Sequence, residues 1–203
     1  YGIPQDNPLV GIKGARPEVY SFGHRQIWKF SHDRHTGLMW GGEVGQDLWE
    51  MVYVIKNGGN YGWSLMEGSH PFRPERKRHE TPIEKPIVEH NHNDFRSIAG
   101  GYVYYGDRLK LLQKHYIYGD FDTGKIWSFM YQNGEAQDWS ELADTSIRLV
   151  SFIEQSDGEL LLVDYASGML HELVKAPPPS LAEHEFPRRL SETGIFKDTA
   201  KMV

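Results

Sequence analysis

Short apolar runs recur along the first 174 residues and are bounded by glycine, aspartate and asparagine. The runs are rich in Val, Ile, Tyr, Phe and Trp, which predicts β-strands joined by tight turns. The predicted strands are Glu18–Phe22, Ile27–His32, Leu38–Glu43, Glu50–Ile55, Gly101–Tyr105, Tyr116–Phe121, Lys125–Tyr131, Ile147–Glu154, Glu159–Tyr165 and Met169–Val174. Only two short helices are predicted, over Asp107–Leu112 and Ser180–His184. The pattern therefore predicts an all-β protein.

An internal repeat groups these strands. Tyr118–Ile126 aligns with Leu162–Leu170, 44 positions later, with matching Asp, aromatic, Ser/Thr, Gly and aliphatic residues. Four-stranded propeller blades repeat with a period of about 40–50 residues. A weaker third copy lies at Trp40–Val44, beyond a long insert around Gly59–Asp94. The repeat favours about three four-stranded antiparallel blades of a β-propeller, although three unrelated hairpins with common turn chemistry would give a similar pattern.

Three blades do not close a ring, because propellers usually contain at least about four. We therefore expect the C-terminal half of a larger ring, or several copies assembled together. After residue 174 the composition changes, and the three prolines of Ala176–Ser180 predict a stiff linker. We expect a partial propeller over residues 1–174. Residues 175–203 are expected to form this linker and the irregular start of a following segment.

Composition narrows the classes of partner. The 203 residues carry a formal net charge of -6, which argues against a nucleic-acid or anionic-membrane partner held by bulk charge. No apolar run approaches the roughly 18 residues of a membrane span. The chain has no cysteine, so disulfides and cysteine metal sites are excluded. Motifs of the Gly-x-Gly-x-x-Gly or Gly-x-Ser-x-Gly type are absent, so a dinucleotide-binding fold or a serine hydrolase has no support.

Two polar groupings invite a functional interpretation. The cluster His90–Asp94 could bind a metal through two imidazoles, but a polar loop between strands is favoured. Asp120 and Asp164 could form a catalytic carboxylate pair, but their matching places in the repeat indicate turn-capping residues.

The segment Gly42–Glu50 is the most informative in the chain. It predicts a strand, a tight glycine loop and a second strand, followed by a glycine-rich hairpin at Gly58–Trp63. Gly45 presents bare backbone, so main-chain carbonyls could approach an ion or a planar ligand. Glu43, Asp47 and Glu50 flank the loop. A plain turn between two strands remains the alternative.

Several motifs together resemble the glucose/sorbosone dehydrogenase family. They are Tyr1–Pro8, Pro17–Arg25, Gly42–Gln46, Gly59–Trp63, Glu67–Gly68 and Gly100–Tyr104. The resemblance covers roughly residues 1–174. It implies the C-terminal half of a six-bladed propeller that uses pyrroloquinoline quinone and calcium to oxidise sugars. It also implies a periplasmic or secreted protein, with a sugar or other polyol as substrate and an electron acceptor such as a cytochrome.

The resemblance also implies site residues. The family usually has Gly-Leu-Arg-Asn-Pro where this chain has Gly23–Ile27, which assigns Arg25 and Gln26 to the quinone. Gly45 and Gln46 match the loop whose backbone carbonyls hold the calcium linked to that cofactor. Glu50 matches the first of two acidic residues that the family often shows at a neighbouring calcium site, and Met51 replaces the second.

Two further positions depart from the family pattern. Asp122 stands where cofactor-binding relatives place a lysine. Of a pair of arginines two apart, only Arg148 is present, and Val150 takes the second position. The family's catalytic histidine lies in the N-terminal half, so no catalytic residue is expected here. The leading hypothesis is a fragment of a quinone-dependent sugar dehydrogenase. The alternative is a non-catalytic propeller that has lost the cofactor site and binds a protein or a glycan.

Overall fold

The computed structural model describes residues 2–76 and 80–176 of the chain. The predicted helix Ser180–His184 and most of the predicted linker lie outside these residues. The expected domain boundary after residue 174 therefore stays a prediction.

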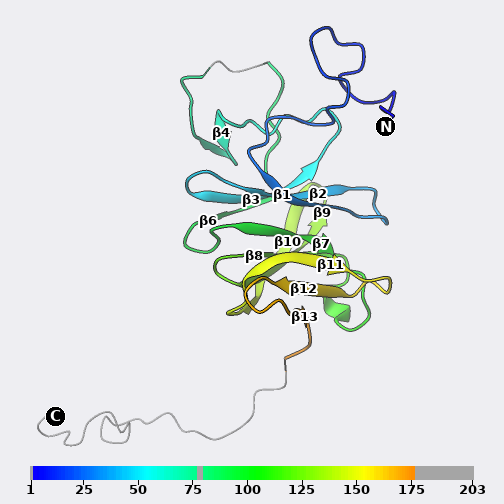
Figure 1. The fold of residues 1–203 in the computed structure, drawn as a ribbon, viewed down its shortest axis with the longest axis vertical. Coiled ribbons are helices and arrows are strands. Elements are labelled where there is room, and N and C mark those ends of the chain that lie inside the picture. The colour runs from blue at the N-terminus through cyan, green and yellow to red at the C-terminus, as the bar shows by residue number, and fades with distance from the viewer. Residues whose placement is uncertain (1, 77–79, 177–203) are drawn as a thin grey trace, which may run out of the picture.

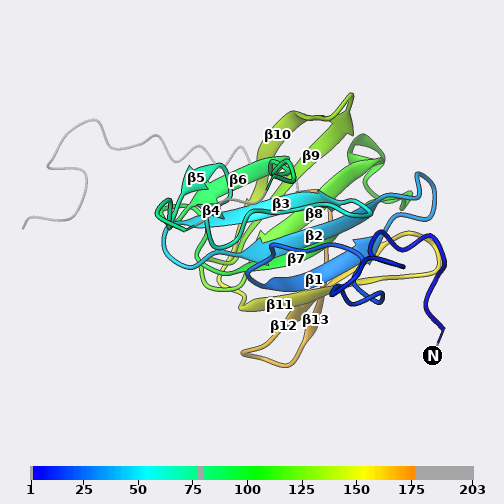
Figure 2. The same cartoon turned by 90° about the horizontal axis from the view of Figure 1, so that it is seen from above.

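Three antiparallel sheets follow one another along the chain. The first comprises β1 (Ile27–His32), β2 (Met39–Val44), β3 (Trp49–Ile55) and β6 (Val88–Asn91). The second comprises β7 (Ile98–Val103), β8 (His115–Asp120), β9 (Lys125–Gln132) and β10 (Glu135–Asp144), and the third β11 (Leu149–Glu154), β12 (Leu160–Asp164) and β13 (Leu170–Glu172). A small hairpin of β4 (Met66–Glu67) and β5 (His70–Pro71) and the 3-10 turn Lys110–Leu112 complete the elements. Figures 1 and 2 show the three sheets stacked face to face. The predicted propeller-blade fold is confirmed, with three strands in the third sheet instead of four.

Strand β8 shows why the sheets stack. Its alternate side chains Tyr116 and Tyr118 join a buried cluster with Trp40 of the first sheet. Ile117, between them, joins a second cluster with Phe152 of the third sheet. Successive side chains of a strand point to opposite faces, so β8 is covered on both sides. The second sheet is thus the middle layer of the stack.

The first two sheets come close where β1 and β2 face β7. A Cβ on Gly42 of β2 would lie 2.6 Å from the Cα of Gly100 on β7, so glycine is required for this approach. Strand β1 also reaches the third sheet, because the Trp28 indole Nε1 donates to the carbonyl of Val150 at 3.0 Å. The first strands β1, β7 and β11 therefore lie next to one another, as inner strands of propeller blades do.

The repeated aspartates do cap turns. Asp120, at the end of β8, accepts hydrogen bonds from the backbone N–H groups of residues 96, 97, 122 and 123. Asp164, at the end of β12, accepts from those of residues 148 and 166. A third turn of the same Asp-x-x-Thr-Gly type begins at Asp33, after β1, and its carboxylate accepts from the N–H of His35. The internal repeat predicted the third copy at Trp40–Val44, in β2, so the equivalent turn at Asp33 is a feature that the sequence pattern did not indicate.

Several local predictions were wrong. Residues 18–22 form no strand, apart from one bridge between Phe22 and Asn60. His90 and Asn91 lie in β6, where a polar loop was favoured. Strand β10 was not predicted at all, because seven of its ten residues are exposed and its sequence is mostly polar. The predicted helix at Asp107–Leu112 reduces to the 3-10 turn.

Candidate functional site

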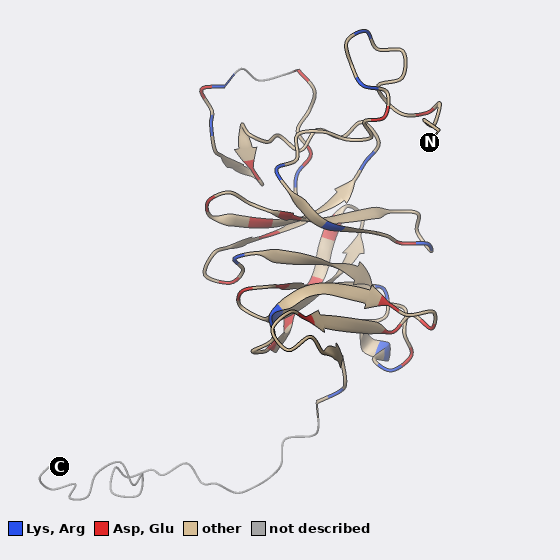
Figure 3. Cartoon of the chain, viewed as in Figure 1, with Lys and Arg blue, Asp and Glu red and all other residues tan. Residues whose placement is uncertain are grey.

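All six predicted site residues lie at one end of the stacked sheets. Arg25 and Gln26 precede β1, and Gly45, Gln46 and Glu50 belong to the β2–β3 turn. Arg148 lies in the connection from β10 to β11. In Figure 1 this end, with the β2–β3 turn, is on the left. Figure 3 shows acidic positions at the end of β2 and the start of β3, where the chain turns.

The β2–β3 turn is organised by one buried carboxylate, that of Glu67 in β4. Its Oε1 accepts hydrogen bonds from the backbone N–H of Gln46 at 2.5 Å and of Asp47 at 2.6 Å. Its Oε2 accepts from the N–H of Leu48 at 3.3 Å. Glu67 is 4% exposed, so this contact is shielded from water. The Glu67-Gly68 motif contributes to the family resemblance, but the sequence does not indicate that Glu67 holds the β2–β3 turn.

This arrangement fixes the direction of two carbonyls. In a planar trans peptide the C=O of one residue points opposite to the N–H of the next. The N–H groups of Gln46 and Asp47 both point at the same Glu67 oxygen. The carbonyls of Gly45 and Gln46 therefore both point away from Glu67, towards the same side. Hard carbonyl oxygens are suitable ligands for calcium.

Gly45 is needed for steric reasons. A Cβ there would lie 1.8 Å from the Trp49 carbonyl oxygen and 2.7 Å from Glu67 Oε1. Its φ is not in the left-handed region. The close approach of the Trp49 carbonyl across the turn, and not the dihedral angle, excludes a side chain at Gly45.

Glu50 is completely buried beneath the turn. Its carboxyl accepts from the N–H of Gly45 at 3.2 Å and of Ile98 at 2.8 Å, and His92 Nε2 lies 3.3 Å from Oε1. Burial above all, together with the negative charges of Asp120 and Glu67, raises the pKa of Glu50 to about 8, although the hydrogen bonds from the backbone N–H groups of Ile98 and Gly45 act to lower it. A carboxyl that is protonated at neutral pH is a poor metal ligand. The described residues contain no cluster of three or more His, Asp or Glu side chains that could hold a metal.

Arg25 is fastened to the same turn. Its Nε and one terminal nitrogen donate to Gln46 Oε1 at 3.2 and 3.1 Å, and the other donates to the Val44 carbonyl at 3.0 Å. Buried Glu43 accepts from the backbone N–H of Arg25 and lies 3.1 Å from His24 Nδ1. Glu43 thus fixes the segment that carries Arg25, a role that the sequence did not reveal.

The side chains of the other two predicted cofactor residues, Gln26 and Arg148, form no hydrogen bond with the β2–β3 turn in the part of the chain that the structure describes. The Gln26 side chain is exposed. The Arg148 guanidinium donates to Asp122 Oδ1 at 2.5 Å and lies over the ring of Phe121, 4.9 Å from its centroid. Arg96 also reaches Asp122, at 3.4 Å. The two positions that depart from the family pattern at this end, Asp122 and Val150, are therefore close to Arg148, and Asp122 neutralises part of its charge.

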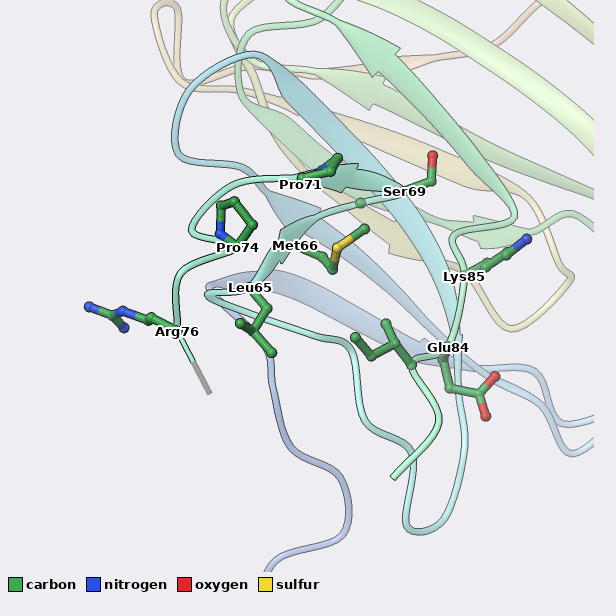
Figure 4. A pocket seen from close by; sticks show the side chains of 10 residues that line it. Leu65, Met66, Ser69, Pro71, Pro74, Arg76, Glu84 and Lys85 are labelled. Carbon is green, nitrogen blue, oxygen red and sulfur yellow. The ribbon is translucent and has the colours of Figure 1, made fainter. Parts of the chain in front are cut away.

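Two cavities lie near these elements. One, of about 230 Å³, is lined by Trp28, Phe121, Val150 and Tyr165, and so belongs to the end that carries Arg148. The other, of about 380 Å³, lies beside the β4–β5 hairpin and contains none of the predicted site residues. Figure 4 shows its apolar walls and its charged rim of Arg76, Glu84 and Lys85. The metal-binding alternative for the His90–Asp94 cluster, which the sequence did not favour, gains no support, because His90 is buried against Phe95 and Tyr118.

Comparison with known proteins agrees with this fold. The family model for glucose/sorbosone dehydrogenase matches residues 2–172. The HIPL1 protein of Arabidopsis thaliana is 33% identical over 141 residues, which are 63% of this chain and 20% of HIPL1. The aldose sugar dehydrogenase YliI of Escherichia coli is 27% identical over 184 residues, which are 87% of this chain and 48% of YliI. A solved glucose dehydrogenase matches with a TM-score of 0.71 at 26% identity, over 86% of this chain and 51% of that one.

The chain thus spans about half of the length of these dehydrogenases, and a fifth of HIPL1. Within the described residues, no helix has the length and apolar character needed to cross a membrane. The match to the family model covers every residue of the three sheets, from Ile27 to Glu172. The chain belongs to the glucose/sorbosone dehydrogenase family.

Proposed function

We propose that this chain supplies calcium and quinone contacts to a dehydrogenase that oxidises a hydroxyl of a sugar or other polyol. Hydride acceptance is the chemistry that pyrroloquinoline quinone supplies when bound, with calcium as Lewis acid. The electron acceptor would be a protein such as a cytochrome, and the compartment periplasmic or secreted. The proposal for the whole protein rests on the family and on this end of the sheets.

The observation that carries the proposal is the pair of N–H groups directed at Glu67 Oε1. Because of it, the carbonyls of Gly45 and Gln46 point the same way and could hold calcium without any acidic side chain. Arg25 is held beside them by Gln46 and brings a planar cationic fork, which suits carboxylates and carbonyls. The residues at this turn therefore fit a calcium ion and an anionic planar cofactor.

The rival function is a non-catalytic propeller that binds a protein or a glycan. The ion pair between Arg148 and Asp122 favours it, because an anionic cofactor would have to compete with a resident carboxylate. Arg96 compensates in part, since two arginines and one aspartate leave one positive charge. Both functions are compatible with the fold, because function resides in the site.

The test is reconstitution of the full-length protein with pyrroloquinoline quinone and calcium, followed by dye reduction with a panel of aldoses and polyols. The proposal expects turnover that depends on both additions and that falls strongly in Arg25→Ala. Lys13→Ala, an exposed position before β1, serves as the matched control and should leave turnover unchanged. No turnover with any sugar would reject the enzyme and favour the scaffold.

A further inference from the structure

A cavity of about 360 Å³ lies at the end of the sheets opposite to the β2–β3 turn. It is formed by the β1–β2 turn, the end of β7, the start of β8 and the end of β9. In Figure 1 the β1–β2 turn and the connection from β7 to β8 lie on the right, away from the proposed calcium loop. Both sheets that form the cavity belong to this chain. Its volume is within the range of about 300–1,000 Å³ that is usual for small-molecule sites.

Its walls are rings held in fixed positions. The His35 imidazole packs against the Tyr105 ring, with centroids 3.9 Å apart. Tyr131 meets the buried Trp40 edge to face, with centroids 5.1 Å apart. The Tyr105 hydroxyl donates to Asp33 Oδ2 at 3.1 Å, which fixes the orientation of that ring. Flat aromatic surfaces that are already in position can receive the C–H face of a pyranose ring at low entropic cost.

The polar groups of the cavity favour an anion. Among the described residues, Asp33, 6% exposed, is the only acidic side chain that lines it, and its oxygens already accept hydrogen bonds from the backbone N–H of His35 and the hydroxyls of Thr36 and Tyr105. Lys114 is exposed, and among the described residues its ammonium forms no ion pair. Its backbone has φ 68°, in the left-handed region that a side chain rarely adopts, while its N–H donates to the Tyr104 carbonyl. The Lys114 backbone is thus held at the mouth of an aromatic cavity, and its side chain carries an exposed positive charge there.

We propose that this cavity binds an acidic sugar, that is, a pyranose carrying a carboxylate, such as a uronate unit. The ring would lie against His35, Tyr105 and Tyr131, and its carboxylate would pair with the Lys114 ammonium. The site is separate from the proposed calcium and quinone contacts, so it does not depend on the proposed function.

The test is calorimetric titration of the full-length protein with galacturonate, galactose and benzoate at low salt. We expect galacturonate to bind at least tenfold more tightly than galactose, which lacks the charge, and than benzoate, which lacks the sugar hydroxyls. Added salt should weaken galacturonate binding, because the pair at the mouth is exposed to solvent. Equal affinity for galactose would overturn the role of the charge, and equal affinity for benzoate would overturn the choice of a sugar. Absence of galacturonate binding would reject the site.

Substitutions in and beside the cavity test whether galacturonate binds there. Lys114→Gly should lower galacturonate affinity at least tenfold, and glycine tolerates the left-handed backbone there, so the fold is retained. His35→Ala should also weaken binding by removing one wall. Lys110→Ala, in the neighbouring 3-10 turn but outside the cavity lining, is the charge-matched control and should change nothing. Unchanged affinity in Lys114→Gly would contradict the proposal. Quinone binding, measured on the same variant, should be unaffected, which separates this site from the proposed dehydrogenase site.

Discussion

Buried carboxyls set the geometry of the β2–β3 turn residue by residue. Glu67 holds the N–H groups of Gln46 and Asp47, and Glu50 holds that of Gly45. The sequence predicted that Gly45 lies in a tight loop between two strands, and the structure places it in the turn between β2 and β3. It could not indicate where the N–H groups point, because Glu67 is about twenty residues away and meets the turn only through the fold.

Substitutions at the neighbouring residues Gly45 and Gln46 should have different effects on calcium binding. Gly45→Val should abolish the rise in melting temperature that calcium gives to the full-length protein, because its Cβ would overlap the Trp49 carbonyl and displace the loop. Gln46→Ala should keep that rise, since only its backbone would bind calcium, but should weaken quinone binding by releasing Arg25. Thermal melts with and without calcium make the measurement. If calcium has no effect on the unmodified protein, or Gln46→Ala loses the effect as fully as Gly45→Val, the loop is only a turn.

Glu50 should make stability depend on pH. Its pKa is about 8 in the folded state and near the ordinary 4.5 when unfolded. Between these values the unfolded chain releases a proton that the folded chain keeps, so its contribution to stability falls as the pH rises from about 5 to 8. The slope is at most about 1.4 kcal/mol per pH unit.

Urea unfolding at pH 5, 6.5 and 8 makes this measurable. The free energy of unfolding of the unmodified protein should decline relative to that of Glu50→Gln, which has no proton to lose. Glu75→Gln, at an exposed carboxyl, should behave like the unmodified protein. A constant difference between the unmodified protein and Glu50→Gln over this range would show that Glu50 is ionised when folded.

Individual elements differ in how well the sequence predicts them. Nine of the ten predicted strands lie within about three residues of observed strands, and most of these bury apolar residues on at least one face. Exposed β10 and the four-residue β6 lack that signal, and both were missed. The offset of 44 residues was informative because Asp120 and Asp164 occupy equivalent turns. The sequence also predicted the glycine loop at Gly45, but not the partners Glu43 and Glu67 that organise this turn and the Arg25 segment beside it.

Packing between the first two sheets should be sensitive to a single methyl group. Gly42→Ala would place a Cβ 2.6 Å from the Gly100 Cα, where backbone meets backbone and neither side can yield by a rotamer change. We expect a loss of about 1–3 kcal/mol in the free energy of unfolding, as for other overpacked cores. Gly2→Ala, with no atom within 4 Å, should change it by less than about 0.5 kcal/mol. Equal unfolding curves for the two variants would contradict the close contact.

For the whole molecule, the turns at one end gather the predicted cofactor contacts, and the opposite end carries a separate aromatic cavity. The sequence predicted the propeller fold and the family, since both follow from long-range patterns that the strands preserve. It could not show that Asp122 pairs with Arg148, because the two residues belong to neighbouring sheets and meet only in the fold.

That contact gives a prediction about affinity. Asp122→Asn should release Arg148 and Arg96 and so raise the affinity of the full-length protein for pyrroloquinoline quinone by about tenfold, the equivalent of roughly 1.4 kcal/mol. Asp138→Asn, an exposed aspartate of β10, is the charge-matched control and should have no effect. Calorimetry on the two variants decides the matter. Unchanged or weaker binding in Asp122→Asn would show that the aspartate does not oppose the cofactor.

The most direct test of the central claim is the binding of pyrroloquinoline quinone to the full-length protein, measured by calorimetry with calcium and again with a chelator. The account predicts binding in the micromolar range or tighter with calcium, and a large loss of affinity without it, because the carbonyls of Gly45 and Gln46 would hold the ion that joins cofactor to protein. No heat of binding in the presence of calcium, from folded protein, would contradict the account and identify the chain as part of a propeller without the cofactor.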